Sequence, residues 1–397
     1  MHAPDRLAER ASRTGAGARA TIVMTHDYPP LSGGGLALGV RELTRLLAGD
    51  HHVLVLSSRL TDHFADDRRC GPAAAWDDGA SYALATAPRA VRSLLRADIL
   101  LAHWTFSCRR LATISVILGP LLGKTTVCVI HTAPGHCEYN RLRHLPDWAR
   151  RALLYLAANA MRRCAAVVAL GPSHSAALAA AGLPATHVLP LMVSLPAAGR
   201  GIGSEHGDAE PARGRPDPSV PTIGIAGELS PLKGSERIPA LLEALTPQFA
   251  FRIAGTGPLA ARLARCVGDL PPEQRARVTM MGWIEPAKMP EFYRAVDFLL
   301  VLSRTEAQPR VILEAMLAEV IVVATRTTGV TDIVSDGVTG VFVDADDPRS
   351  CHRRLADLVG DPVQAAAIRG HAARFAAGRL QESGDRWRRF VAELLAE

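Results

Sequence analysis

The sequence predicts an α/β protein made of two doubly wound, Rossmann-like domains that face each other across a cleft. Short apolar runs bounded by loops alternate with stretches of helical periodicity, which is typical of parallel βαβ units. The alternation stops at Gly199–Pro221, which is rich in Gly, Pro and charge, and then starts again. Each half opens with a strand followed by a glycine-bearing loop. In such sheets, ligands bind beyond the carboxyl ends of the strands.

The length of 397 residues fits two or three domains. The expected order is a disordered tail, an amino-terminal Rossmann-like domain, a linker, a carboxyl-terminal Rossmann-like domain and a last helix that crosses back to the first domain. These five parts are expected at residues 1–18, 19–195, 196–220, 221–375 and 376–397.

In the first half, short apolar runs predict buried parallel strands. They lie at Ala20–Thr25, Val53–Ser57, Asp98–Ala102, Thr126–Ile130 and Ala166–Leu170. Apolar residues at helical spacing predict helices at Leu36–Leu47 and Trp148–Ala160.

The second half repeats the same pattern. Its strands are expected at Thr222–Ala226, Phe251–Ala254, Val278–Met281, Phe298–Leu302, Ile321–Ala324 and Gly340–Val343. Helices are expected at Val311–Leu317 and Ser350–Leu358, and a last helix of about 15 residues is expected near Asp385–Ala396.

Composition excludes some classes of protein. A hydrophobic fraction of 48% with 21% charged residues indicates a globular chain. Aromatic residues make up only 5%, so nothing indicates a base-stacking, nucleic-acid-binding surface. The net charge of +6 is uneven, because residues 1–198 carry 21 basic and 13 acidic side chains. That half could meet an anionic acceptor or a membrane surface. We favour a solvated arginine-rich face, so peripheral membrane contact is the less favoured interpretation.

The cysteines and the hydropathy pattern point to the cytoplasm. Seven cysteines are scattered without a CxxC pair, as expected of reduced thiols in a cytosol. No apolar run approaches the roughly 20 residues of a spanning helix. Met1–Ala18 is charged and lacks the apolar core of a signal peptide.

Three glycine-bearing loops follow predicted strands. Gly33–Gly35 would let backbone N–H groups approach a phosphate, and a flexible loop is the alternative. Gly255–Gly257, taken alone, is a strand-to-helix turn. Gly227–Gly234 contains Lys233, one of only three lysines, where a cation could meet an anion. The alternative is a surface lysine in a turn.

Glu306 and Glu314 form the best pair of carboxylates. Seven residues separate them, and eight steps of a helix would rise about 12 Å. A glycosidase pair needs about 5–9.5 Å. We expect Glu306 in a loop, Pro309 at the start of the helix and Glu314 one turn inside it, which suits one extended ligand gripped at two points. His131 ends a strand, where its side chain projects into the cleft or is merely structural.

Taken in order, these segments resemble the retaining glycosyltransferases of family 4, which have the GT-B architecture. The resemblance runs from about Thr21 to Asp346. It is carried by Pro29-Pro30 with Gly33-Gly34-Gly35, His103-Trp104, Val129-Ile130-His131, Leu229 with Lys233-Gly234, Ile253–Pro258, Met281-Gly282-Trp283, Asp297 and Ser303 with Glu306-x7-Glu314-Ala315-Met316, and Asp332–Gly340.

The resemblance implies transfer of a hexosyl group from a nucleotide diphosphate-sugar with retention, the acceptor lying in the amino-terminal domain and the donor in the carboxyl-terminal one. It implies that Lys233 contacts the diphosphate, Glu306 the donor sugar, Glu314 the ribose and His131 the transferred sugar. Further donor-binding residues are implied at Gly34, Gly35, Gly255, Trp283, Arg310 and Val311. The nucleotide sugar is a co-substrate, and neither a cofactor nor a metal is implied.

The sequence departs from the family pattern at several positions. Glu228 stands where the family often has Arg, and Pro309 has no N–H to donate. Two interpretations of Arg310 stay open: it points into water, or it supplies the missing cation and neutralises Glu228. The other departures are Leu191-Met192, Glu319 and Ile321.

The favoured function is therefore a cytoplasmic, metal-independent retaining glycosyltransferase that acts on a hydroxyl acceptor. A natural-product acceptor such as an aminocyclitol, as in antibiotic biosynthesis, competes with a cell-envelope lipid carrier. Two alternatives remain open: a nucleotide-sugar epimerase of the same architecture, and a non-catalytic nucleotide-sugar-binding partner.

Overall fold

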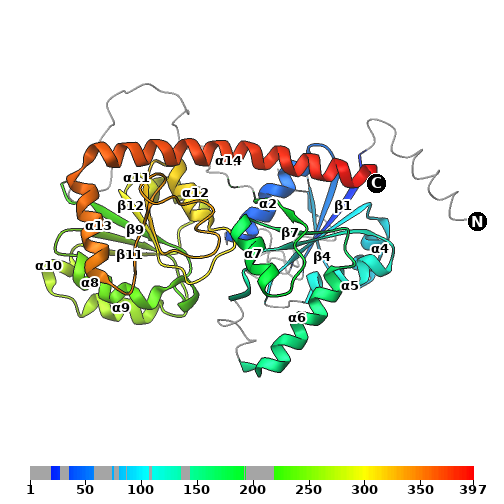
Figure 1. Ribbon diagram of the computed structural model, residues 1–397, viewed down its shortest axis with the longest axis horizontal. Helices are drawn as coiled ribbons and strands as arrows, with labels where there is room; N and C mark the ends of the chain where they lie inside the picture. Colours follow the sequence, from blue (N-terminus) through cyan, green and yellow to red (C-terminus); the bar gives the residue numbers. More distant parts are fainter. Residues whose placement is uncertain are drawn as a thin grey trace, which may run out of the picture.

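The structure, a computed structural model, describes residues 19–26, 35–57, 74–75, 80–85, 87–106, 110–135, 144–191, 193 and 219–397. The predicted tail, most of the predicted linker and Gly34 lie outside the described residues. Figure 1 shows two lobes side by side, with one long helix running along both. Each lobe contains one sheet, and the predicted α/β class with two doubly wound sheets is confirmed.

The amino-terminal sheet has the strand order β3-β4-β2-β1-β5-β6-β7-β8, and all its pairs are parallel except β3 with β4. The strands read as continuous apolar runs because both faces of the sheet are covered. Their bounds are β1 (Thr21–His26), β2 (His52–Ser57), β3 (Ala74–Ala75), β4 (Ser81–Leu84), β5 (Ile99–Trp104), β6 (Thr125–Ile130), β7 (Ala166–Ala169) and β8 (His187–Val188).

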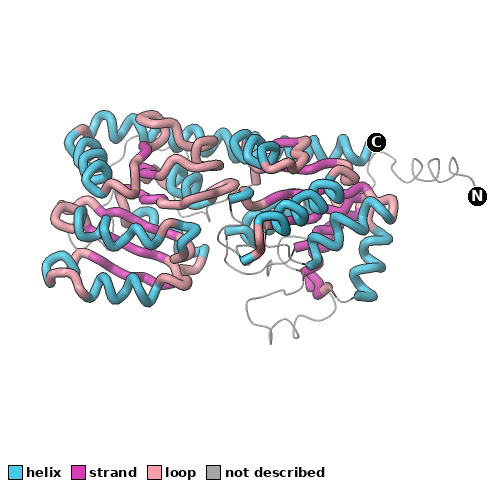
Figure 2. The backbone as a smooth tube through the Cα atoms, turned by 60° about the horizontal axis from the view of Figure 1, so that its bottom comes forward, coloured by secondary structure: helices cyan, strands magenta, loops and turns pink. Residues whose placement is uncertain are grey.

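The helices of this lobe cover the two faces of the sheet separately. Alternate residues of a strand point to opposite faces. Ile22 therefore packs in one cluster with Leu43 of α2, whereas Val23 packs in another with Leu94 of α4. The helices are α2 (Gly35–Ala48), α4 (Ala87–Arg96), α5 (Arg110–Leu121), α6 (Asp147–Met161) and α7 (Pro172–Ala180). In Figure 2 the strands of each lobe lie among the helices of the same lobe.

The carboxyl-terminal sheet is parallel throughout, with the order β11-β10-β9-β12-β13-β14. Its order reverses between β9 and β12, since β10 and β11 extend to one side and β13 and β14 to the other. The strands are β9 (Thr222–Ala226), β10 (Ala250–Ala254), β11 (Val278–Gly282), β12 (Phe298–Val301), β13 (Ile321–Ala324) and β14 (Val341–Phe342).

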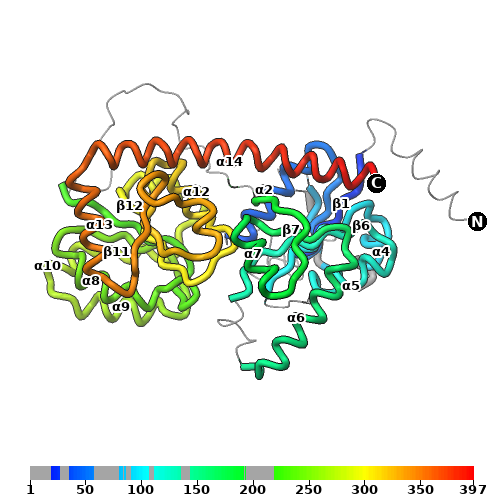
Figure 3. The backbone as a smooth tube through the Cα atoms, in the orientation of Figure 1, coloured from blue at the N-terminus to red at the C-terminus, as the bar shows by residue number. Residues whose placement is uncertain are grey.

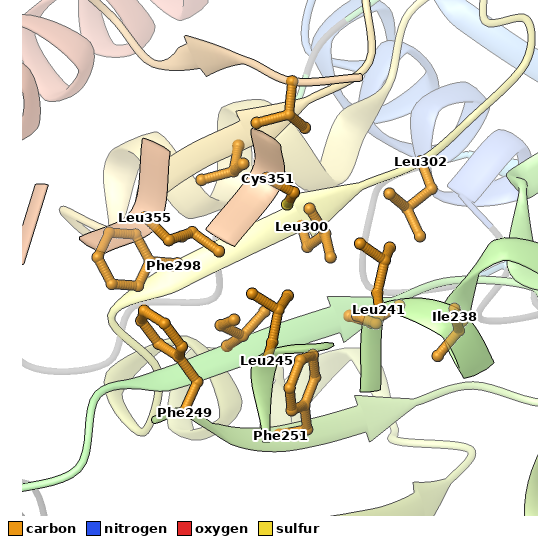
Figure 4. Packing of buried hydrophobic residues seen from close by; sticks show 14 of the residues in the cluster. Ile238, Leu241, Leu245, Phe249, Phe251, Phe298, Leu300, Leu302, Cys351 and Leu355 are labelled. Carbon is orange, nitrogen blue, oxygen red and sulfur yellow. The ribbon is translucent and has the colours of Figure 1, made fainter. Parts of the chain in front are cut away.

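Helices cover this second sheet as well. They are α8 (Ile238–Leu245), α9 (Ala260–Gly268), α10 (Pro272–Arg275), α11 (Met289–Arg294), α12 (Arg310–Leu317) and α13 (Pro348–Gly360). Figure 4 shows one side of the core, where Leu245 of α8 and Leu355 of α13 lie over the rings of Phe251 and Phe298. All four side chains are buried, so this layer fixes the strands from which the site loops emerge.

The last helix corrects one sequence prediction. Instead of a helix of about 15 residues starting near residue 376 or later, α14 (Pro362–Ala396) has 35 residues. Its start is capped by the Asp361 side chain, which accepts from the backbone N–H of Gln364. In the middle of α14, glycines and small residues weaken the apolar periodicity. The sequence pattern therefore did not predict the first half of the helix.

Both lobes are bound by α14, which Figure 3 draws as one continuous rod. Its first half packs on the carboxyl-terminal core through Ile368 and Ala372. Its second half places Trp387 in the amino-terminal core, where the indole N–H donates to the carbonyl oxygen of Pro190 at 2.9 Å.

Candidate active site

Two of the predicted site residues follow strands on either side of the point where the order of the carboxyl-terminal sheet reverses. Lys233 lies in the loop after β9, and Glu306 lies in the loop after β12. These strands are direct neighbours. A reversal of strand order opens space at the carboxyl edge of an α/β sheet, and ligands bind there. The topology thus brings together two residues that are 73 positions apart in the sequence.

Lys233 and Glu306 form an ion pair. The Nζ atom of Lys233 lies 2.5 Å from Oε1 of Glu306, and the hydroxyl of Ser303 donates to the same oxygen at 2.7 Å. The Glu306 side chain is 11% exposed and that of Lys233 is 34% exposed. The carboxylate is therefore fixed by a cation and a hydroxyl, while a third of the lysine remains open to a ligand.

Glycines make the close approach of these loops possible. Gly234, directly after Lys233, has φ +67°, and a Cβ there would lie 2.1 Å from the carbonyl oxygen of Leu302. Gly255, in the loop after β10, has φ +147°, and a Cβ there would lie 1.8 Å from the carbonyl oxygen of Gly227. Only glycine fits either position. The loop after β9 therefore packs directly against the loops after β10 and β12.

Glu314 lies one turn inside α12, as the sequence predicted. The hydroxyl of Tyr293 donates to its Oε2 at 2.8 Å, and Nη2 of Arg310 lies 3.4 Å from its Oε1. Burial, with the nearby Glu314 carboxylate, raises the pKa of Tyr293 well above its usual value, so the phenol stays protonated and remains a donor. Sequence reasoning missed Tyr293, because nothing in its local pattern distinguishes it from a core aromatic.

Arg310 is buried between the two lobes. A methyl group built on Gly39 of α2 would lie 3.6 Å from its Nη1 atom. Its ion pair is with Glu314, whereas the carboxylate of Glu228 accepts from the hydroxyl of Ser230 at 3.2 Å. The alternative that Arg310 points into water is therefore wrong. Neutralisation of Glu228 by Arg310 stays a prediction.

Three histidines occupy the carboxyl edge of the amino-terminal sheet. His26 ends β1, His103 lies in the neighbouring β5, and His131 directly follows β6. The Nδ1 atom of His103 and the Nε2 atom of His131 are 2.7 Å apart, so one ring donates to the other. The rings of His26 and His103 meet edge to face with their centroids 5.8 Å apart. The sequence had marked only His131 as a candidate site residue.

His103 and His131 are neutral at pH 7. Burial lowers the pKa of His103 and of His131 well below the usual value, and neighbouring histidines lower it further. Nδ1 of His131 is buried and has no hydrogen-bond partner within the described part of the chain. This edge therefore offers uncharged hydrogen-bonding groups rather than cations.

The carboxyl edges of the two sheets meet. A Cβ built on Gly135, after β6, would lie 3.6 Å from the hydroxyl oxygen of Thr305, after β12. The backbone N–H and the hydroxyl of Ser173 both donate to the carboxylate of Asp332, at 3.0 and 2.8 Å. The loops that follow the strands of His131 and Glu306 therefore meet at the junction of the lobes.

The four remaining candidates are Trp283, Val311, Gly35 and Gly34. Trp283 follows β11 and is 54% exposed. Val311 is the second residue of α12, and Gly35 is the first of α2. Gly34 lies outside the described residues. Within the ranges that the structure describes, no group of three or more His, Cys, Asp or Glu side chains could hold a metal ion.

Two family models match the chain, one for each lobe. The model described as Glycosyltransferase Family 4 matches residues 33–195, and the model described as Glycosyl transferases group 1 matches residues 220–361. The boundary between the two matches falls in the segment that sequence analysis expected to be a linker. Together the matches cover the carboxyl-terminal sheet, every strand of the amino-terminal sheet except β1, and all the candidate site residues.

Curated relatives resemble part of the chain. A D-inositol 3-phosphate glycosyltransferase of Thermobispora bispora is 34% identical over 177 residues, which is 40% of this chain and 41% of the relative. A GDP-mannose-dependent α-(1-6)-phosphatidylinositol monomannoside mannosyltransferase of Mycolicibacterium smegmatis is 31% identical over 158 residues, 37% of this chain and 41% of the relative. The chain thus spans about two fifths of the length of the curated relatives it matches.

Solved structures resemble the whole fold. The Anabaena protein Alr3699/HepE in complex with UDP-glucose superposes with a TM-score of 0.71 at 17% identity, covering 94% of this chain and 100% of that one. Sucrose-phosphate synthase of Thermosynechococcus elongatus gives 0.70 at 17% identity, covering 95% and 100%. At such low identity the likeness shows the fold, which is the GT-B architecture. The chain belongs to the glycosyltransferases that join a family 4 amino-terminal domain to a group 1 carboxyl-terminal domain.

Proposed function

We propose that this chain is a retaining hexosyltransferase that moves a sugar from a nucleotide diphosphate-sugar to a hydroxyl of a polyol acceptor. The observation that carries the proposal is the Lys233–Glu306 pair at the reversal point of the carboxyl-terminal sheet. A partly exposed lysine beside tight glycine turns is suited to a diphosphate, whose negative charge grows as the glycosidic bond breaks. Since Lys233 supplies the positive charge, the proposal needs neither a metal nor a cofactor.

Glu306 is assigned to the transferred sugar. Lys233 and Ser303 both bind its Oε1 atom, so Oε2 is the oxygen that would accept from a sugar hydroxyl. Across the junction, His131 is the other sugar contact, and the lack of a described partner for its buried Nδ1 atom supports this role. A contact that strengthens as positive charge develops on the sugar would raise the rate.

The chemistry balances without a protein base. The bond between the anomeric carbon and the diphosphate oxygen breaks, and the diphosphate leaves with the electron pair. The acceptor hydroxyl oxygen bonds to the same face of the anomeric carbon, and its proton passes to the leaving phosphate oxygen. Lys233 stabilises the charge left on the diphosphate. Retention of configuration follows from attack on the face that the diphosphate leaves.

The rest of the donor is assigned to the same edge. Glu314, oriented by Tyr293 and Arg310, would accept from the ribose hydroxyls. The half-exposed ring of Trp283 offers a flat surface for the base. Gly34, Gly35, Gly255 and Val311 complete the proposed donor site through their backbone and small side chains.

We assign the acceptor to the polyols. The relatives are named for D-inositol 3-phosphate and for a phosphatidylinositol monomannoside, so both names contain inositol, in the second case as part of a lipid. A neutral edge of buried histidines suits hydroxyl groups. A soluble cyclitol of natural-product type and a lipid-linked polyol are both within this class. We place the reaction in the cytoplasm, which is supported by the free thiols of Cys128, Cys164, Cys266 and Cys351.

The first experiment screens UDP-, GDP-, ADP- and dTDP-sugars by thermal shift. A donor at 100 times its dissociation constant should stabilise the protein by roughly 2.7 kcal/mol. The bound donor is then incubated with inositol, inositol 3-phosphate and phosphatidylinositol vesicles, with and without EDTA. An α-linked product from an α-linked donor, seen by NMR and unchanged by EDTA, supports the proposal. A β-linked product contradicts retention, and loss of activity to EDTA contradicts metal independence.

The same assay separates the two alternatives. A non-catalytic partner would bind the donor but give no product with any acceptor. An epimerase would convert the nucleotide sugar to its 2-epimer in the absence of an acceptor, which NMR of the sugar H2 signal detects. Either result would overturn the transferase assignment while leaving donor binding intact.

A further inference from the structure

The outer sides of α4, α5 and α6 carry an unusual number of exposed apolar side chains. Among the described residues, 15 large apolar side chains are exposed, and 11 of them lie on or beside these three helices. They are Val91, Leu95, Ile114, Ile117, Leu118, Leu121, Leu122, Trp148, Leu153, Tyr155 and Leu156, which we call the outer apolar surface. Isolated exposed apolar residues are ordinary, but a concentration of this kind marks an interaction surface.

Helix α5 shows that the pattern is regular. Its inner side packs on the sheet through Ala112 and Val116. Its outer side presents apolar residues at positions i, i+3, i+4, i+7 and i+8, beginning at Ile114, each between 39% and 60% exposed. A surface helix ordinarily turns charged or polar residues outward. This helix is apolar on both sides, so a second partner is expected on the outside.

Helix α6 adds aromatic side chains. Only Ala158 and Met161, near its end, are buried, and the helix extends away from the lobe in Figure 1. Trp148, Tyr155 and Leu156 stand at i, i+7 and i+8 and are 63% to 74% exposed. Tryptophan and tyrosine combine an apolar body with a polar tip, which suits the boundary between water and lipid.

The three helices lie next to one another. The Nζ atom of Lys124, just after α5, donates to the carbonyl oxygens of Leu95 and Ala97 at the end of α4. The thiol of Cys164, just after α6, lies 3.9 Å from the carbonyl oxygen of Val116 in α5. All three cover the face of the sheet opposite to α2 and α14. The outer apolar surface is therefore one layer of the lobe.

The charge around this layer selects the partner. Among the described residues of the segment 87–164, nine are basic and two are acidic, a net charge of +7. Arg92, Arg96, Arg151, Arg162 and Arg163 are exposed. Two copies of such a surface would repel each other, whereas an anionic surface attracts it. Apolar helices bordered by arginine and aromatic residues lie in the headgroup region of bilayers that contain anionic lipid.

We propose that the outer sides of α4, α5 and α6 dock the protein onto the surface of an anionic lipid bilayer. Docking is peripheral, because no helix in the described part of the chain has the length and apolar content to cross a bilayer. The proposal takes up the membrane surface, which the sequence left open as the less favoured alternative to a solvated basic face. It is independent of the proposed transferase activity, since binding needs neither donor nor acceptor.

The test is sedimentation with vesicles in the absence of any substrate. Wild type should bind vesicles of 70% phosphatidylcholine and 30% phosphatidylglycerol at least tenfold more tightly than pure phosphatidylcholine, and less tightly in 1 M NaCl. The pairs Trp148→Ser with Tyr155→Ser, and Arg151→Gln with Arg163→Gln, should each weaken binding at least tenfold. The matched control Val338→Ser with Val363→Ser, at exposed apolar positions of the other lobe, should bind as wild type does.

Two results would overturn the proposal. One is equal or absent binding to the two kinds of vesicle when circular dichroism shows a folded protein. The other is a stable dimer in sedimentation velocity that the Trp148→Ser with Tyr155→Ser pair dissociates, because a second copy would then be the occupant of this surface. Loss of transferase activity with vesicle binding retained would contradict only the proposed function.

Discussion

At the carboxyl edge of the amino-terminal sheet the prominent polar side chains are buried, neutral histidines, whereas at the matching edge of the carboxyl-terminal sheet they form ion pairs. His103 and His131 share one hydrogen bond and have lowered pKa values. Lys233 with Glu306 and Arg310 with Glu314 keep their charges within contact distance. Both edges are formed by the carboxyl ends of parallel strands, but they differ in charge. Burial removes the charge of an unpaired group, whereas a partner of opposite sign preserves it.

The difference fits a division of labour between the lobes. An uncharged hydrogen-bonding edge suits a neutral sugar or polyol, and a charged edge suits a diphosphate. Each prediction below alters one edge or the elements that hold it.

The largest effect is expected from removing the cation of the charged edge. Lys233→Met should lower kcat by about 10²–10³-fold, the scale of losing one charge-stabilising donor at a transition state. The matched control is Lys288→Met, an exposed lysine in the same lobe, which should keep wild-type kcat. Steady-state kinetics with the donor found by thermal shift is the measurement. Equal losses in both variants would show that Lys233 has no special role.

The neutral edge should make the fold sensitive to acid. His174 belongs to this group: its Nε2 bonds the carbonyl oxygen of Thr132, and its Nδ1 accepts from the N–H of Leu170. Burial lowers its pKa from 6.5 to about 4. The unfolded chain then binds more protons than the folded one between these values, so stability is full above pH 6.5 and falls as the pH drops toward 4.

For His174 alone the loss amounts to about 3 kcal/mol, at about 1.4 kcal/mol for each pH unit of difference. Urea unfolding from pH 7.5 to 4.5 measures it. His174→Gln should flatten the slope, and the exposed control His371→Gln should not. If the unfolding free energy of the wild type stays constant from pH 7 to pH 5, folding does not lower the pKa of His174, and the prediction is wrong.

The second ion pair of the charged edge should affect donor binding more than the chemical step. Arg310→Ala should weaken binding by roughly 1.5–3 kcal/mol, the scale of a charged hydrogen bond. If Arg310 serves the diphosphate, adding Glu228→Arg to Arg310→Ala should recover part of the lost binding free energy. If Arg310 acts by orienting Glu314, the double variant Arg310→Ala with Glu314→Gln should lose less binding free energy than the sum of the two single variants. Isothermal titration with the donor measures Arg310→Ala, Glu314→Gln and the two double variants. An Arg310→Ala protein that binds like wild type would reject both roles.

The smallest effect concerns the helix that carries the charged edge. Glu319, just after α12, has φ +58° and is the one non-glycine residue of the described chain in the left-handed region. Such a conformation costs a side chain about 1–2 kcal/mol. Glu319→Gly should therefore raise the unfolding free energy by about 0.5–1 kcal/mol, once the entropy of the added glycine is subtracted. Glu319→Ala, which keeps a Cβ, should give no gain. Urea unfolding decides between them.

Local pattern was enough to locate most central strands. Strands such as β9 and β12 read as apolar runs because both of their faces are buried. The strands β3, β4 and β8 were missed, since none of them forms a sustained apolar run. Lys233 and Glu306 could be proposed because a rare lysine and a regularly spaced carboxylate follow predicted strands. Tyr293 and Asp332 could not, because their significance lies in contacts with residues 21 and 159 positions away.

By itself, the sequence determined that this protein has two parallel α/β lobes, which loops follow which strands, and which residue types those loops carry. These properties depend on period and on neighbours a few residues away. Only the tertiary structure decided that the ion pair of Arg310 is with Glu314, that three histidines gather at one edge, that α14 binds both lobes, and that the outer apolar surface is a single layer. These contacts depend on which segments, distant in the sequence, pack against each other in the low-dielectric interior. No local sequence pattern encodes that packing.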